Sequence, residues 1–238
     1  GSPDKAVAEL KDALGTKPGF KRANLLLIFA HLQNKKWDDA AAAAADLAAR
    51  QPDDPVPLNL LGSALAGKGD EAGAKSQFER ALALKADFYS ASLNLAALEE
   101  RAGDHTAAAE RYAKILEEMP GQEQAAMALA RLVEQRGDQD ETDRLLQLAR
   151  TNNKQSLGPR VILGNRYLRQ GRLEEAQRVT DEAERIAPNN PDVRLAMARL
   201  HAARGQSVGA RAIFEELVKV APDNTTLRFE LARVELRA

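Results

Sequence analysis

The feature that most constrains this chain is a repeat of 34 residues that runs along it without an insertion. Three columns of residues, each spaced by that step, mark the repeat. Alanine holds six of the seven places in the first column, and Thr142 holds the remaining one. A chain built from one short unit folds as a stack of units, because no single unit can bury its apolar face alone. The alanines are Ala6, Ala40, Ala74, Ala108, Ala176 and Ala210.

The other two columns show what the unit is. Glycine suits a turn that needs a left-handed backbone, and proline ends a helix because it has no N–H to continue it. The unit is therefore predicted to be a helix, a glycine turn, a second helix and a proline turn. The glycines are Gly69, Gly103, Gly137, Gly171 and Gly205. The prolines are Pro18, Pro52, Pro120, Pro188 and Pro222.

This register predicts one continuous array without a domain boundary. Residues 1–2 look like a cloning scar, residues 3–20 form a half unit with only a second helix, and residues 225–238 form a half unit with only a first helix. Six whole units lie between them, at 21–54, 55–88, 89–122, 123–156, 157–190 and 191–224.

Each unit supplies a regular core. In the first helix a large residue precedes a short one, as in Leu61 and Gly62, so that neighbouring helices approach closely. The second helix packs a large residue such as Phe78 four places after the alanine column. Some positions depart from the pattern: Lys35 replaces the turn glycine, and Ala86 and Lys154 replace the closing proline. Asp70, Asp104 and Asp138 follow the turn glycine and are predicted to cap the next helix.

Composition excludes several classes of function. The chain has 34 basic and 35 acidic residues, so no overall field draws a nucleic acid or an anionic membrane. It has no cysteine, which excludes disulfides, thiol nucleophiles and thiolate metal ligands. No apolar run approaches the length of a membrane span, so this chain is not expected to insert into a membrane.

No catalytic or cofactor motif is present. The sequence has neither a phosphate-binding glycine loop nor a nucleophile elbow, and we expect no enzyme activity and no cofactor. His31 and His201 are predicted to pack in or near the core, and His105 to lie on the surface. No pair of histidines has the spacing of metal ligands, so no metal site is expected.

The candidate binding surface is the inner, concave face, which the first helices form in this architecture. One position there reads Phe29, Ser63, Ala97, Arg131, Asn165, Arg199 and Arg233. A second row reads Arg160, Arg194 and Arg228. Regularly spaced guanidinium groups suit an acidic peptide, a C-terminal carboxylate or an anionic polysaccharide. The alternative is that these arginines form ion pairs with acidic residues of adjacent units.

The columns resemble those of the tetratricopeptide repeat family over almost the whole chain. That resemblance implies an all-α fold, a right-handed superhelical solenoid of antiparallel helix pairs, that binds proteins or peptides on its concave face. The family's carboxylate clamp is not matched. Asn94 fits its middle place, but Asn59, Ser63, Gln124 and Ala128 occupy the flanking places. The predicted partner-binding residues are Asn59, Ser63, Asn94, Arg131, Asn165, Arg169, Arg199 and Arg233.

Three segments resemble a narrower group, the large repeat lipoproteins of bacterial exosortase, or PEP-CTERM, systems. They are residues 25–32, 51–70 and 158–176. That resemblance implies a role in exopolysaccharide and protein-sorting machinery. It also implies a periplasmic location, with an outer-membrane lipid anchor in the full-length protein. We interpret the chain as a non-catalytic scaffold for partner proteins. The alternatives are direct binding of an anionic exopolysaccharide by the arginine and asparagine row, or a structural spacer without a ligand.

Overall fold

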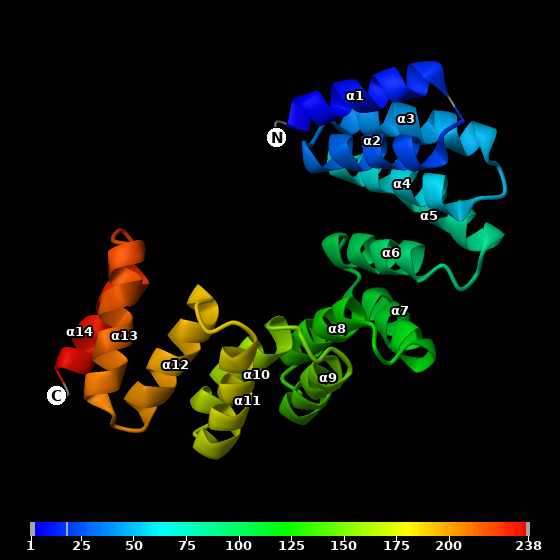
Figure 1. The fold of residues 1–238 in the computed structure, drawn as a ribbon. Coiled ribbons are helices and arrows are strands. Elements are labelled where there is room, and N and C mark those ends of the chain that lie inside the picture. The colour runs from blue at the N-terminus through cyan, green and yellow to red at the C-terminus, as the bar shows by residue number, and fades with distance from the viewer. Residues whose placement is uncertain (1–2, 18, 237–238) are drawn as a thin grey trace. The chain divides into compact units, whose positions relative to one another are not determined.

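The structure is a computed structural model that describes residues 3–17 and 19–236. All regular elements within these ranges are α-helices, arranged as successive antiparallel pairs, so the predicted fold class is confirmed (Figure 1). The chain forms two compact units, Gly1–Glu118 and Met119–Ala238. Residues 1–2, interpreted above as a cloning scar, lie outside the described residues, as do Pro18 of the proline column and residues 237–238.

The amino-terminal unit holds three helix pairs preceded by a single helix. The single helix α1 packs on the first pair, and each later pair packs on the one before it. Its core contains a cluster around Phe78, Ala91 and Leu95, and another around Ile28 and Leu47. The helices are α1 Pro3–Thr16, α2 Lys21–Gln33, α3 Trp37–Arg50, α4 Pro55–Lys68, α5 Glu71–Leu84, α6 Tyr89–Arg101 and α7 His105–Glu118.

The carboxy-terminal unit holds three further pairs followed by a single helix. Phe214 is fully buried in a core cluster that joins α12, α13 and α14. The helices are α8 Glu123–Gln135, α9 Gln139–Asn152, α10 Gly158–Arg169, α11 Leu173–Ile186, α12 Pro191–Ala203, α13 Ser207–Val220 and α14 Thr225–Glu235.

The turns follow the chemistry expected from the sequence. All five column glycines have positive φ, between 73° and 92°. Lys35, at the same place in the first whole unit, also adopts positive φ, at 56°. The predicted caps are confirmed: Asp70, Asp104 and Asp138 each accept a bond from a backbone N–H in the first turn of the following helix, at 2.9–3.0 Å.

Close packing between paired helices depends on the small residues of the first helix. A Cβ on Gly62 would lie 2.5 Å from Cε1 of Phe78, so the Phe78 ring occupies the space that a side chain would need. A Cβ on Gly164 would be less crowded than one on Gly62, since it would lie 3.1 Å from the Thr180 hydroxyl oxygen. The alternation of large and small residues therefore sets the spacing of the helices that carry the candidate surface.

Candidate partner-binding surface

In the amino-terminal unit, three predicted binding residues contact one another. Asn94 on α6 donates from its side-chain nitrogen to the Asn59 side-chain oxygen at 2.8 Å, and to the Ser63 hydroxyl at 3.4 Å. Ser63 in turn donates to the Asn59 carbonyl at 3.0 Å. Among the described residues, the Asn94 side-chain oxygen and the Asn59 side-chain nitrogen make no further hydrogen bond. One acceptor and one donor thus have no partner in the protein; Asn94 is partly exposed, and Asn59 is 9% exposed.

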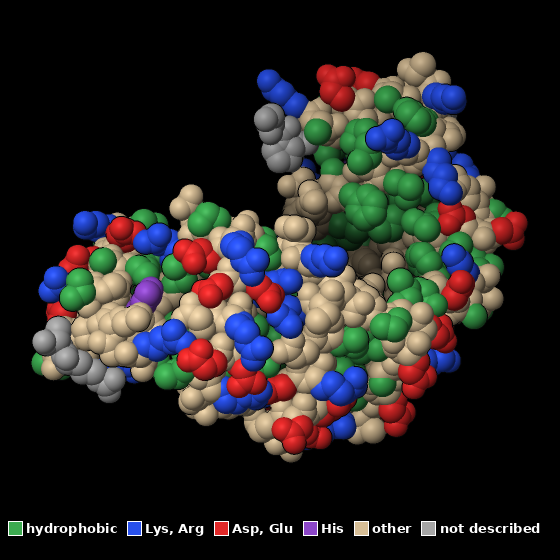
Figure 2. Space-filling view, turned by 60° about the horizontal axis from the view of Figure 1, so that its bottom comes forward, with side chains coloured by type: hydrophobic (Ala, Val, Ile, Leu, Met, Phe, Trp, Pro, Cys, Tyr) green, Lys and Arg blue, Asp and Glu red, His purple; other side chains and the backbone are tan. Residues whose placement is uncertain are grey.

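Apolar side chains lie on the neighbouring first helix. Leu26 and Phe29 on α2 are 49% and 47% exposed, unusual values for large apolar residues. Phe29 and Ser63 share one repeat position, and Ala97 on α6 continues it with an exposed small residue. Figure 2 shows hydrophobic side chains gathered on one face of this unit. The combination of exposed apolar groups and a small polar cluster suits a peptide, which has apolar side chains and a polar backbone.

In the carboxy-terminal unit the same row is ionic. Arg199 on α12 donates to the Asn165 side-chain oxygen at 3.2 Å and lies 3.6 Å from Glu230 on α14. Arg233 lies 2.6 Å from Glu230, whose side chain is only 12% exposed. The ion-pair alternative therefore applies to Arg199 and Arg233, and neither guanidinium is an unpaired anion site. Lys and Arg side chains lie among Asp and Glu side chains on the face of this unit in Figure 2.

The two clusters use the same pair of repeat positions. Ser63 and Asn94 are 31 residues apart, as are Arg199 and Glu230, and each pair joins the first helices of adjacent units. The contact is between neutral side chains in the amino-terminal unit and between charged side chains in the carboxy-terminal unit. This recurring cross-repeat contact is a feature that the single-residue rows did not reveal.

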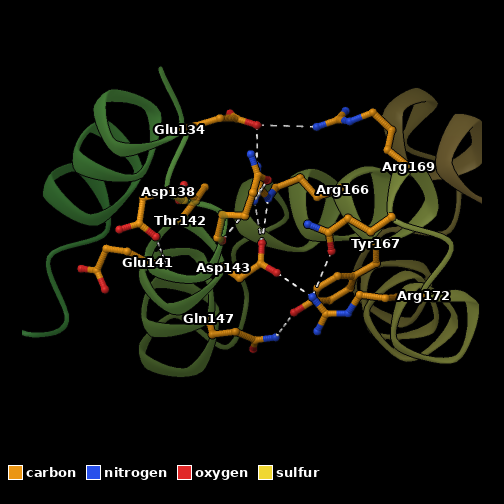
Figure 3. Close-up of polar contacts among 12 residues, drawn as sticks. Glu134, Asp138, Glu141, Thr142, Asp143, Gln147, Arg166, Tyr167, Arg169 and Arg172 are labelled. Carbon is orange, nitrogen blue, oxygen red and sulfur yellow. Dashed lines mark hydrogen bonds and ion pairs between the residues drawn. The ribbon is translucent and has the colours of Figure 1, made fainter. Parts of the chain in front are cut away.

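Arg131 and Arg169 are the other two predicted residues. Arg131 is exposed and lines a cavity of about 430 Å³ with Met127 and Ile162; it also has an interaction partner of its own. Arg169 is exposed and approaches Glu134 at 3.7 Å (Figure 3).

The guanidinium groups of the second arginine row are all bonded within the protein. Arg160 is only 6% exposed; it donates to the Asn153 and Ser156 carbonyls at 3.0 and 2.7 Å, and to Glu182 at 3.1 Å. Arg194 pairs with Glu216, and Arg228 donates to the Pro222 carbonyl at 2.6 Å. These side chains fold back onto turns and second helices, because open carbonyls at helix ends attract cationic donors.

One strongly buried charge was not predicted from the sequence. Arg166 on α10 is 2% exposed, and it donates to Asp143 at 2.8 Å, to Glu134 at 2.5 Å and to the Gln139 side chain at 2.9 Å (Figure 3). Its place in the repeat holds Ala64, Leu98, Leu132, Leu200 and Val234 in other units. A break in that apolar column was the available signal.

Arg172 completes the network around Arg166. It donates to Asp143 at 2.7 Å and to Glu175, and its guanidinium lies over the Tyr167 ring, 4.2 Å from the ring centre. The bond from Arg172 lowers the pKa of Glu175, and the bond to Glu175 raises the pKa of Arg172. Because every charge here is matched within the protein, the network links α8 to α11 and offers no open binding group.

The histidines do not form a site. His31 is 3% exposed and packs in the core, as predicted, and burial lowers its pKa. His201 is partly buried with its ring nitrogen 2.5 Å from Gln206, and His105 is exposed at the start of α7. Among the described residues no group of three or more His, Asp or Glu side chains is arranged to hold a metal ion. None of the described helices combines the length and apolar character needed to cross a membrane.

Comparisons with known proteins point to one family. Models of the tetratricopeptide repeat match residues 1–63 and 167–231, and a second model of the same repeat matches residues 59–123. No curated protein sequence matches the chain.

Solved structures share the fold at low sequence identity. PilF of Pseudomonas aeruginosa is 13% identical with a TM-score of 0.73, and 99% of each chain is covered. A tetratricopeptide repeat protein from Parabacteroides merdae is 18% identical with a TM-score of 0.65, over 77% of this chain and 73% of that one. YrrB, described as a repeat protein with an unusual peptide-binding site, is 16% identical with a TM-score of 0.59, over 80% and 98%.

Proposed function

The chain belongs to the tetratricopeptide repeat family, and from that premise we propose that it is a non-catalytic scaffold that binds a partner protein through an extended peptide segment. Proteins built from this repeat generally hold other proteins or peptides on surfaces made by several units. The same role in this chain falls to its first helices.

The observation that carries the proposal is the surface formed by Leu26 and Phe29 on α2 together with Asn59, Ser63 and Asn94. We call it the amide patch. The three polar residues hold one another in place, so little side-chain entropy is lost when a ligand binds. The remaining amide oxygen and nitrogen suit the N–H and C=O groups of a peptide backbone, and the two apolar residues suit its side chains.

Selection from a random peptide library on the immobilised chain tests this role. The wild-type chain is expected to enrich a consensus peptide, whose affinity is then measured by calorimetry. Asn94→Ala and Phe29→Ala should each lower the affinity for that peptide about tenfold, because each substitution removes a central contact. Matched controls are Asn152→Ala and Val208→Ala, exposed residues on second helices, which should leave the affinity unchanged.

Two results would contradict the proposal. Peptides that bind equally to the wild-type chain and to Asn94→Ala would remove the amide patch from the site. The absence of any enriched peptide would favour the spacer alternative, in which the repeats only separate other parts of a longer protein.

We further propose that the partner belongs to an exopolysaccharide or PEP-CTERM sorting system of a bacterial envelope. Its support is the resemblance of residues 25–32, 51–70 and 158–176 to repeat lipoproteins of such systems. Two of these segments contain Leu26, Phe29, Asn59 and Ser63 of the amide patch, and many of their other residues are core and turn positions. Cell fractionation of the full-length protein in its host tests this proposal: a periplasmic or outer-membrane location is expected, and a cytoplasmic one would overturn it.

Direct binding of an anionic polysaccharide by the arginine row has less support. Glu230 lies between Arg199 and Arg233, so an anionic sugar would have to displace a largely buried carboxylate. The amide patch, by contrast, carries no charge that a neutral peptide must displace.

A further inference from the structure

Three cavities of this chain are the same feature repeated at different places. Each lies at the start of a first helix, beside the turn that precedes this helix and the carboxyl end of the second helix that follows it. We call this feature the turn groove. The three grooves are lined by equivalent residues of the repeat, which are separated by multiples of 34. One such set is Ser92, Arg160 and Arg194, and another is Lys114, Glu182 and Glu216. The repeat thus supplies its own internal comparison.

Charge distinguishes one groove from the other two. The groove at α9, α10 and α11 is lined by four cationic side chains and one anionic side chain, Glu182. The groove at α5, α6 and α7 has two cationic and three anionic residues, and the groove at α12, α13 and α14 has one cationic and two anionic residues. The cationic set is Arg150, Lys154, Arg160 and Arg185.

Complementing helix dipoles does not account for this excess. Every second helix ends in open carbonyls that favour a nearby cation. Yet one unit later the places of Arg150 and Arg185 are held by Glu184 and Lys219, and no other unit has cations at both places. The place of Lys154 holds proline in most units, and only here does it hold a charge. Several cations have therefore been gathered at one groove of a repeated series.

Two of these cations are fixed and two are open. Glu182 pairs with Arg150 at 2.7 Å and with Arg160 at 3.1 Å, and Arg160 is buried against the turn at residues 153–156. Lys154 and Arg185 lie exposed at the rim, and within the described residues neither forms an ion pair; Arg185 donates only to the Asp181 carbonyl, at 3.3 Å. The single carboxylate is thus already shared by two guanidinium groups, which leaves the rim cations without a counter-charge.

We infer that the turn groove at α9 to α11 binds an acidic segment of a partner protein, with Lys154 and Arg185 pairing its carboxylates. The cavity holds about 570 Å³, within the ~300–1,000 Å³ of sites that bind ligands, so it has room for more than one side chain. Guanidinium forks match carboxylates in geometry, and Ile186 provides an apolar contact at the same groove. This inference rests on the proposed role as a protein-binding scaffold, but it concerns a different surface from the amide patch.

Binding of fluorescein-labelled hexaglutamate, followed by anisotropy, tests the inference. The wild-type chain should bind it, with affinity that falls as salt rises from about 50 to about 200 mM because rim charges are screened. The double variant Lys154→Glu/Arg185→Glu should weaken binding at least about tenfold. The matched control Lys114→Glu/Lys219→Glu makes the same change in net charge on α7 and α13, away from this groove, and should cost less than about twofold.

The outcomes separate this inference from the general proposal. If the two double variants lose equal affinity for hexaglutamate, net charge alone attracts the peptide, and the groove is not its binding site. Displacement of the peptide by an equal concentration of inorganic phosphate would overturn the assignment to a peptide segment. If the wild-type chain does not bind hexaglutamate while library peptides still depend on Asn94, the groove is refuted and the scaffold role stands.

Discussion

At the scale of single residues, the largest departure from the repeat is a charge in an apolar column. Arg166 stands where other units place leucine, valine or alanine, and it is tolerated because three acceptors on α8 and α9 surround it. A buried ion pair is weak evidence of net stability, but breaking one leaves an uncompensated charge. The acceptors are less buried than Arg166, since Glu134 is 43% exposed, which moderates the penalty.

Removing that guanidinium should therefore be costly. We expect Arg166→Ala to lower the free energy of unfolding by about 3 kcal/mol, because a cavity remains behind and Asp143 keeps only Arg172 as a cationic partner. Arg144→Ala removes an exposed pair with Glu141 and should cost no more than about 0.5 kcal/mol. Urea unfolding followed by circular dichroism measures both, and similar small losses in the two variants would show that the Arg166 network contributes little.

His31 should make the stability depend on pH. Burial, opposed by nearby Asp39, lowers its pKa from the usual 6.5, so the unfolded chain binds the proton more readily than the folded chain. The free energy of unfolding should then fall as pH drops below 6.5, while above that value the histidine is neutral in both states and the penalty is absent.

Replacing this histidine tests that dependence. His31→Leu introduces the residue found at the equivalent place of the next unit, Leu65, and should flatten the change in melting temperature between about pH 7.5 and pH 5. His105→Gln, at an exposed residue, should keep the wild-type slope. A leucine variant that loses stability on acidification as steeply as the wild-type chain would assign the effect to other groups.

At the scale of helices and turns, the sequence predicts most of the structure because local chemistry decides it. Pro52, Pro120, Pro188 and Pro222 each lie two residues beyond the end of a second helix. Lys35 follows the glycine column in backbone conformation even though it has a side chain, since the neighbouring helices dictate the turn. Such positions need no knowledge of distant contacts.

The candidate site was less predictable, because pairing across units depends on side-chain reach. The row of Asn165, Arg199 and Arg233 was visible from the sequence, but the carboxylate that joins its arginines was not. Glu230 occupies a repeat position that holds Leu60, Ala128 and Ala196 in other units, so the repeat pattern does not predict a carboxylate there. The turn groove was likewise hidden, since its residues come from three helices and only their arrangement gathers them.

Close approach of paired helices gives a prediction at this scale. Gly62→Ala should lower the free energy of unfolding by about 1–3 kcal/mol, because the new methyl group overlaps the Phe78 ring. Gly15→Ala on α1 meets no atom within 4 Å and should instead stabilise by about 0.5–1 kcal/mol. Thermal unfolding of both variants distinguishes crowding from the general effect of glycine. A neutral Gly62→Ala would mean that the ring moves aside freely.

At the scale of the whole molecule, each of the two compact units contains its own core. The clusters around Phe78 and Leu47 lie within residues 1–118, and the cluster around Phe214 lies within residues 119–238. In a repeat array stability is approximately a sum over units and their interfaces with neighbours, so neither half should require the other to form helices.

Each half expressed alone should therefore fold. Residues 1–118 and 119–238 are expected to show helical circular dichroism and sigmoidal urea unfolding, with m-values near half that of the whole chain, because m follows the surface exposed on unfolding. A fragment of residues 1–135 provides the comparison, since it carries α8 without its paired helix α9. Those added residues should contribute little helical signal, because an isolated helix of 13 residues is marginal in water. If either half is unfolded when it is expressed alone, the array folds only as one cooperative body, and its stability depends on the interfaces between repeats more than on the repeats themselves.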